Sequence, residues 1–102
     1  MASLYDLGEG VYVTADFTDP VSGTPTDPTT VTLRVLSPSQ AAGAPTVYIY
    51  GTDPEVTKPA AGSYQGLLEA TEVGLWQYRW EGENAAPAIQ EGTFVVRRTD
   101  LA

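Results

Sequence analysis

The fold is decided by the stretch Leu75-Trp76-Gln77-Tyr78-Arg79-Trp80-Glu81, in which large apolar or aromatic side chains alternate with polar ones. A period of two residues is that of a β-strand, because successive side chains point to opposite faces of a sheet. Trp76, Tyr78 and Trp80 therefore share one face, and aromatic side chains suit the pleated, half-buried surface of a sheet. The stretch predicts a central strand over residues 75–81.

The same alternation recurs on both sides of this strand, between segments rich in Gly, Pro, Asp and Thr. Such segments are typical of turns, because these residues cap their own backbone or fix φ. The expected strands cover residues 10–17, 30–36, 46–50, 55–58, 63–69, 75–81 and 92–98. Helix has little support, since the Ala-rich segments 41–44 and 85–88 are short and contain or adjoin proline. About seven short strands predict an all-β, antiparallel β-sandwich.

With 102 residues, the chain is long enough for one hydrophobic core and too short for two. The alternating pattern assigns residues 10–98 to a single domain. Residues 1–9 are expected to form an N-terminal arm, which is fixed only on assembly, and residues 99–102 a C-terminal tail. The first six residues lack the basic and apolar regions of a secretory signal.

Composition excludes most catalytic and nucleic-acid-binding classes. The chain has no His and no Cys, so it lacks an imidazole base, a thiolate nucleophile, a disulfide and the usual zinc ligands. Its net charge of −8 repels phosphate backbones and anionic membranes. The acids Asp16, Asp19, Asp27, Asp53 and Glu55 lack the spacing of a calcium loop. We therefore expect no enzyme activity, catalytic residue, metal, cofactor, nucleic-acid partner or membrane partner.

A resemblance to a known family enters at Glu72-Val73-Gly74-Leu75-Trp76-Gln77-Tyr78. This segment resembles the corner motif of immunoglobulin-like domains, which reads acid, any residue, Gly, any residue, Tyr, any residue, Cys. Trp76 stands at the Tyr position and Tyr78 at the Cys position, so the inter-sheet disulfide of the family cannot form. The corner hydrogen bond must then come from an indole N–H or be lost. Trp76, Tyr78 and Phe94 are expected to fill the core without a disulfide.

The chain also contains Gly10-Val-Tyr-Val, Asp27-Pro-Thr-Thr-Val-Thr-Leu-Arg and Gly92-Thr-Phe-Val-Val-Arg. Over roughly residues 5–98 it resembles small immunoglobulin-like proteins encoded among the structural genes of tailed phages and prophages. The resemblance implies a non-catalytic virion protein that decorates the capsid or lies near the head–tail junction. Its partners would be virion proteins arranged in a symmetric lattice, with a homo-oligomer on the particle as one arrangement. The protein would be made in the bacterial cytoplasm and located in the virion. The alternative is a carbohydrate- or host-surface-binding module of a tail fibre or a bacterial surface protein.

Four residues are candidates for an interaction surface: Tyr48, Tyr50, Trp80 and Arg97. If Val47 and Ile49 point inward, Tyr48 and Tyr50 point outward. The two tyrosines would then either form a protein contact or pack across neighbouring strands. Trp80 lies at the end of its strand and could stack on a sugar, although core filling is the favoured interpretation. Arg97 is one of three arginines on expected strands, which would form local ion pairs or an interface seam.

Overall fold

The computed structural model describes residues 3–40, 44–83 and 88–98, and it gives only the backbone of Ser3. These residues form eight strands in two sheets, and none of them forms a helix that could cross a membrane. The strands are β1 Ser3–Asp6, β2 Gly10–Asp16, β3 Val31–Leu36, β4 Thr46–Ile49, β5 Val56–Ala60, β6 Ser63–Glu69, β7 Gly74–Gly82 and β8 Ala88–Arg97. The all-β prediction is confirmed, with eight strands where about seven were expected.

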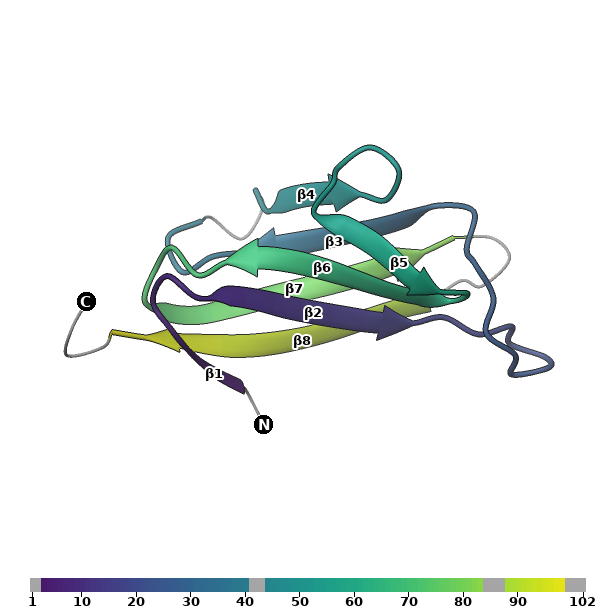
Figure 1. Cartoon of the computed structure of the whole chain (residues 1–102), viewed down its shortest axis with the longest axis horizontal. Coiled ribbons are helices and arrows are strands. Elements are labelled where there is room, and N and C mark those ends of the chain that lie inside the picture. The colour runs from purple at the N-terminus through teal and green to yellow at the C-terminus, as the bar shows by residue number, and fades with distance from the viewer. Residues whose placement is uncertain (1–2, 41–43, 84–87, 99–102) are drawn as a thin grey trace.

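The strands are arranged as a five-stranded sheet of order β1-β8-β7-β3-β4 and a three-stranded sheet of order β2-β6-β5. Every neighbouring pair is antiparallel except β1 and β8, which run parallel. The two sheets lie face to face, with β2, β6 and β5 in front of the larger sheet in Figure 1. The molecule is elongated along its strands, with extents of 48 × 26 × 26 Å.

The core lies between the two sheets and is built from alternate residues of each strand. Its largest fully buried side chains are Trp80, Phe17, Phe94, Leu33, Val11 and Val96. Trp76 stacks on Phe94 with the ring centroids 5.4 Å apart, and the Tyr78 ring lies 6.2 Å from Phe94. Trp76 and Phe94 are buried, and Tyr78 is partly buried and packs against the core, so the expectation that these three rings fill the core is confirmed. Aromatic rings supply the large buried area that a short chain without cross-links needs.

The corner before β7 is closed by an indole N–H. Trp76 Nε1 donates a hydrogen bond to the carbonyl oxygen of Glu72 at 3.0 Å. The Glu72 carboxylate accepts bonds from the Ser39 hydroxyl at 2.9 Å and the Ser39 backbone N–H at 3.2 Å. The pKa of Glu72 is lowered mainly by the Ser39 hydroxyl and next by the Ser37 hydroxyl. One residue thus joins the corner to the segment that follows β3.

The N-terminal segment differs from its prediction, because residues 3–6 form strand β1. This strand pairs with the end of β8 from Ser3 opposite Phe94 to Asp6 opposite Arg97. Tyr5 packs edge-on against Phe94 with the centroids 5.7 Å apart. An arm that waits for assembly was therefore the wrong expectation for these residues. Four residues are too few for alternation to show, and their partner is at the other end of the sequence.

The final strand also begins earlier than predicted. β8 starts at Ala88, which pairs with Gly82, whereas the sequence pattern indicated a start at residue 92. Residues 88–91 carry no β-branched or aromatic alternation apart from Ile89, so their extended conformation comes from pairing with β7. Residues 41–43 and 84–87 and the predicted tail at 99–102 lie outside the described residues.

The long turn between β2 and β3 is fastened to the opposite side of its sheet by Asp27. Its carboxylate accepts hydrogen bonds from the Gly62 N–H at 2.8 Å and from Lys58 Nζ at 2.9 Å. These contacts, the Gly62 bond first, hold the pKa of Asp27 below its ordinary value. Gly62 has a φ of 73°, and a Cβ at this position would lie 2.5 Å from the Phe17 carbonyl oxygen. Only glycine suits both requirements.

Candidate functional site

Trp80 lies inside the molecule and not on its surface. Its side chain is fully buried, with 0% exposure, at the centre of the core. Leu33 of β3, also at 0% exposure, stands opposite it in the strand register. Trp80 therefore cannot take part in a surface contact as the sequence suggested. Its place near the end of the expected strand was misleading, because β7 continues to Gly82 and pairs with β8 along that whole length.

The two candidate tyrosines do not form an exposed pair. Tyr48 stands opposite Leu33 and packs against the core, whereas Val47 is 40% exposed on the other face of β4. The pKa of Tyr48 is raised by burial first and then by the negative charges nearby. Tyr50 lies in the turn after β4, 40% exposed, with its ring edge-on to Tyr64. The inward and outward faces of this strand are thus the reverse of those predicted, since alternation fixes the period of a strand and not its phase.

Arg97 lies at the exposed end of β8, as expected. Its Nε donates to the carboxylate of Asp6, on the neighbouring strand β1, at 2.6 Å. The pair lies on the side of the five-stranded sheet that faces away from the core, which we call the outer face. This face consists of the side chains that alternate with the core residues on β1, β8, β7, β3 and β4. Arg97 thus leads to a larger surface that the sequence did not delimit.

The outer face combines exposed apolar side chains with a line of ion pairs. Its apolar members are Leu4, Val47, Ile49, Leu75 and Ile89, which are half of the large hydrophobic residues exposed on the described chain. The ion pairs run across three strands: Glu81 binds Arg34 at 3.1 Å and Arg79 at 3.1 Å, and Arg79 approaches Glu91 at 3.8 Å. We call this line the ion ladder. It confirms that the arginines on strands form local ion pairs.

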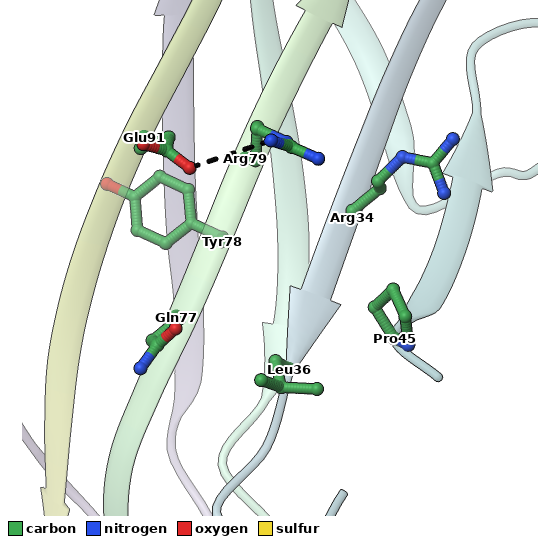
Figure 2. A pocket seen from close by; sticks show the side chains of 7 residues that line it. All are labelled: Arg34, Leu36, Pro45, Gln77, Tyr78, Arg79 and Glu91. Carbon is green, nitrogen blue, oxygen red and sulfur yellow. Dashed lines mark ion pairs between the residues drawn. The ribbon is translucent and has the colours of Figure 1, made fainter. Parts of the chain in front are cut away.

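A hollow of about 230 Å³ lies on the outer face beside the ladder. Figure 2 shows the side chains that line it, which are Arg34 and Leu36 from β3, Gln77, Tyr78 and Arg79 from β7, Glu91 from β8, and Pro45. The dashed line in Figure 2 marks the pair between Arg79 and Glu91. The hollow offers both guanidinium and apolar groups to a ligand or partner.

Charge is distributed unevenly between the outer face and the rest of the chain. The outer face carries three bases and three acids, which are Arg34, Arg79, Arg97, Asp6, Glu81 and Glu91. The chain has thirteen acids and five bases, so the remaining ten acids and two bases carry its whole net charge of −8. The outer face is therefore electrically neutral on a strongly acidic protein. Protein interfaces have apolar cores and are enriched in Arg, and the outer face has both exposed apolar side chains and three arginines.

Two further cavities lie at the open side between β4 and β6. They have volumes of about 390 and 470 Å³, and Tyr48, Leu68 and Glu69 line both of them. Among the residues that the structure describes, no group of three or more acidic side chains is close enough to hold a metal ion. These cavities therefore offer one partly buried phenol and scattered carboxylates.

Several residues of the outer face escaped sequence reasoning, notably Glu81, Glu91, Leu75 and Ile89. The signal for Leu75 and Glu81 was present, because the alternation that puts Trp76 in the core also sets the intervening side chains of the same strand on the opposite face, whereas Ile89 and Glu91 precede the predicted start of the last strand. What the sequence does not contain is the register that brings Glu91 beside the arginine of β7.

Comparison with known proteins gives a fold relationship. No protein-family model matches the chain, and no curated protein matches it. The structure is similar to part of a putative glycoside hydrolase from Bacteroides vulgatus ATCC 8482, with a TM-score of 0.60 and 13% sequence identity. The match covers 95% of this chain but 16% of that chain. At this level of identity the likeness concerns the fold alone.

Proposed function

We propose that the chain is an immunoglobulin-like β-sandwich that acts as a non-catalytic protein-binding module. The order β2-β6-β5 corresponds to strands B, E and D of that fold, and β8-β7-β3-β4 to strands G, F, C and C′. The hydrogen bond from Trp76 to Glu72 stands where the fold has its tyrosine corner. Topology and corner together support this assignment more strongly than either does alone.

The observation that carries the proposed function is the neutral, partly apolar outer face. On a chain of net charge −8, the neutral outer face is the surface that repels an acidic protein partner least. The resemblance of the sequence to phage structural proteins suggests where the protein acts, namely as an accessory protein on the capsid or near the head–tail junction. Many copies bound in register to a symmetric lattice would hold firmly even when each contact is weak.

The proposal is tested with purified protein and capsids that lack it. The chain should bind to saturation at a fixed ratio to the capsid subunits. Leu75→Glu, which puts a charge on the outer face, should weaken binding at least tenfold, or about 1.4 kcal/mol. Leu67→Glu is the matched control, because Leu67 is 44% exposed on the other sheet and Leu75 is 48% exposed.

Two results would contradict the proposed function. One is the absence of the protein from purified particles by mass spectrometry. The other is equal binding of the two Leu→Glu variants, since that would remove the outer face from the interaction.

A carbohydrate-binding module is the second candidate, favoured by one observation. The chain shares its fold with a portion of a protein named a putative glycoside hydrolase. Both tryptophans are buried, at 6% and 0% exposure, so a sugar would have to stack on the exposed Tyr12 or Tyr50. Isothermal titration with a polysaccharide panel tests this function. Heat of binding that Tyr12→Ala or Tyr50→Ala abolishes would support it, and flat titrations would exclude it for that panel.

A further inference from the structure

One edge of the five-stranded sheet is only partly covered. β8 pairs with β7 over its whole length from Ala88 to Val96, but β1 pairs with it only from Phe94 to Arg97. Among the described residues, no strand pairs with the other side of residues 88–93. Six residues of strand span about 20 Å, which is the length of a typical strand in a globular protein.

The backbone groups at this edge can be assigned from one hydrogen bond. The Arg97 carbonyl oxygen accepts from the Leu7 N–H at 2.9 Å, so the backbone of Arg97 points away from β7. The N–H and C=O of one residue point to the same side, and the side alternates along a strand. The register between β7 and β8 is unbroken. Ile89, Glu91 and Thr93 therefore direct their backbone groups away from β7. Because Ser3 stands opposite Phe94, the Thr93 C=O faces the Ser3 N–H, and Ile89 and Glu91 direct two N–H and two C=O groups toward the free edge.

This edge has few of the features that normally discourage another strand from pairing. Residues 88–93 contain no proline and no lysine, no bulge interrupts their pairing with β7, and Glu91 is their only charged residue. The opposite situation holds at β5, an edge of the other sheet, which carries Lys58, Pro59 and a register shift. The contrast indicates that the β8 edge is kept open, whereas β5 is protected.

The chemistry around the edge indicates what kind of strand it takes. The ion ladder alternates in sign from Arg34 through Glu81 and Arg79 and ends on Glu91, whose side chain is 70% exposed. The next group in this alternation is a cation. A hollow of about 370 Å³ lies here, lined by Gln77, Tyr78, Glu91, Gly92 and Thr93.

On the core side of β8, Gly92 makes room for the ring of Tyr78, because a Cβ at Gly92 would lie 2.9 Å from its Cε1 atom and closer still to its hydroxyl. This places the Tyr78 hydroxyl over β8, within the lining of the hollow. Burial raises the pKa of Tyr78, so at neutral pH the phenol is protonated and can donate a hydrogen bond. The edge therefore offers a phenolic donor besides its backbone groups.

We propose that the free edge of β8 binds an extended segment of a partner protein, which adds a strand beside Ile89 and Glu91 and places a Lys or Arg next to Glu91. This inference rests on the proposed role in protein binding. The partner segment would carry an apolar residue beside Ile89, two positions from its cation, because side chains on one face of a strand recur every second residue. Main-chain bonds would supply affinity and the alternate side chains specificity.

A second copy of this chain is a poorer occupant. In an antiparallel, two-fold pairing of two such edges, matching the three outward residues places Glu91 directly opposite its counterpart. Like charges directly opposite each other on neighbouring strands are destabilising. Each copy also brings a net charge of −8.

The register of β1 makes a tethered test available. Because Ser3 lies opposite Phe94, a residue added directly before Met1 would fall opposite Glu91 in the same register, and one added two positions earlier would fall opposite Ile89. The extension Thr-Val-Thr-Lys, behind a new start Met, therefore carries the required pattern. Pro-Val-Pro-Lys, which we call the Pro extension, is the matched control, because it keeps the Val and the Lys and places its prolines at the two positions whose N–H groups would face β8.

The readout is amide hydrogen exchange measured by NMR. In the unextended chain, Gln90 and Gly92 should exchange slowly because they bond to β7, and Ile89 and Glu91 quickly. The Lys extension should slow exchange at Ile89 and Glu91 at least tenfold, and the Pro extension should not. Ending the extension in Glu should weaken the protection roughly threefold to tenfold, and Glu91→Lys should restore it. Glu55→Lys, which changes the net charge equally at a distant turn, should not restore it.

Equal exchange of the Ile89 and Glu91 amides in the Lys- and Pro-extended chains would overturn the proposal. Dimerisation of the unextended chain that the Lys extension abolishes would also overturn it, since a second copy would then be the occupant. On capsids, the Lys-extended chain should bind at least tenfold more weakly than the Pro-extended chain. If both bind equally while Leu75→Glu weakens binding, the proposed function stands and the edge is not the docking site. If no chain binds capsids, the proposed function fails, and amide exchange decides the edge by itself.

Discussion

Replacing each tryptophan with phenylalanine offers a direct measure of the corner hydrogen bond. Trp76 and Trp80 lie on the same face of β7, at 6% and 0% exposure. The indole N–H of Trp76 donates to the Glu72 carbonyl oxygen at 3.0 Å. The indole N–H of Trp80 is buried without a partner among the described residues. The two substitutions therefore remove the same atoms and differ in the hydrogen bond.

The expected free energies follow from this difference. Going from indole to phenyl removes apolar surface equivalent to two or three methylene groups, which costs about 2 kcal/mol in a core. Trp76→Phe loses in addition a hydrogen bond of about 1 kcal/mol, for a total near ~3 kcal/mol. Trp80→Phe removes an unsatisfied buried donor and regains about 1 kcal/mol, for a total near ~1 kcal/mol. Trp76→Phe should thus be the more destabilising by about 2 kcal/mol.

Urea unfolding followed by far-ultraviolet circular dichroism measures both free energies, and the melting temperatures of the two variants should differ by roughly 8–16 °C. Benzothienylalanine at each position is the control, because sulfur replaces the N–H with little change of shape. It should cost about 1 kcal/mol at position 76 and be neutral or stabilising at position 80. The reasoning is refuted if Trp80→Phe is as destabilising as Trp76→Phe, or if benzothienylalanine is neutral at position 76.

Two further predictions concern the turns. Gly62→Ala should be more destabilising than Gly51→Ala by about 2 kcal/mol in thermal unfolding. Both glycines have a positive φ, but only at Gly62 would an added Cβ clash with the backbone, since it would lie 2.5 Å from the Phe17 carbonyl oxygen. Equal costs would show that φ alone matters. The pKa of Asp27 lies below its ordinary value of 3.8, held there by the Gly62 N–H first and Lys58 second, so its stabilising effect is present above that value and lost as the pH falls through the lowered pKa. Asp27→Asn should therefore lower stability at neutral pH and flatten the acid limb of a melting-temperature profile, and an unchanged limb would contradict this assignment.

Most strands could be predicted because alternation is a local property. The pattern around Trp76 and Trp80 gives both the strand and its buried face, and Val11, Val13 and Ala15 do the same for β2. Prediction failed where the structure depends on a distant partner. β1 is a strand because β8 provides its neighbour, and the early start of β8 follows from pairing with β7.

The candidate site was harder to predict, for a related reason. Tyr48 and Val47 alternate as expected, yet which of them is buried depends on Leu33 across the strand pair. The ion ladder likewise requires the registers of β3, β7 and β8 together, which bring Glu81 between two arginines. Composition gives the net charge of −8, but it does not show that the charges on the outer face cancel.

The N-terminal strand connects the charge of the outer face with the state of the β8 edge. Without β1, the face would lose Asp6 and keep Arg97, so three bases would stand against two acids and its neutrality would end. The free edge of β8 would also extend through Phe94 to the end of the strand. The described part of β1 neutralises one end of the face, and no described strand pairs with residues 88–92 on the side away from β7. A strand long enough to cover that edge would also occupy the place beside Glu91, where the ion ladder lacks its next cation.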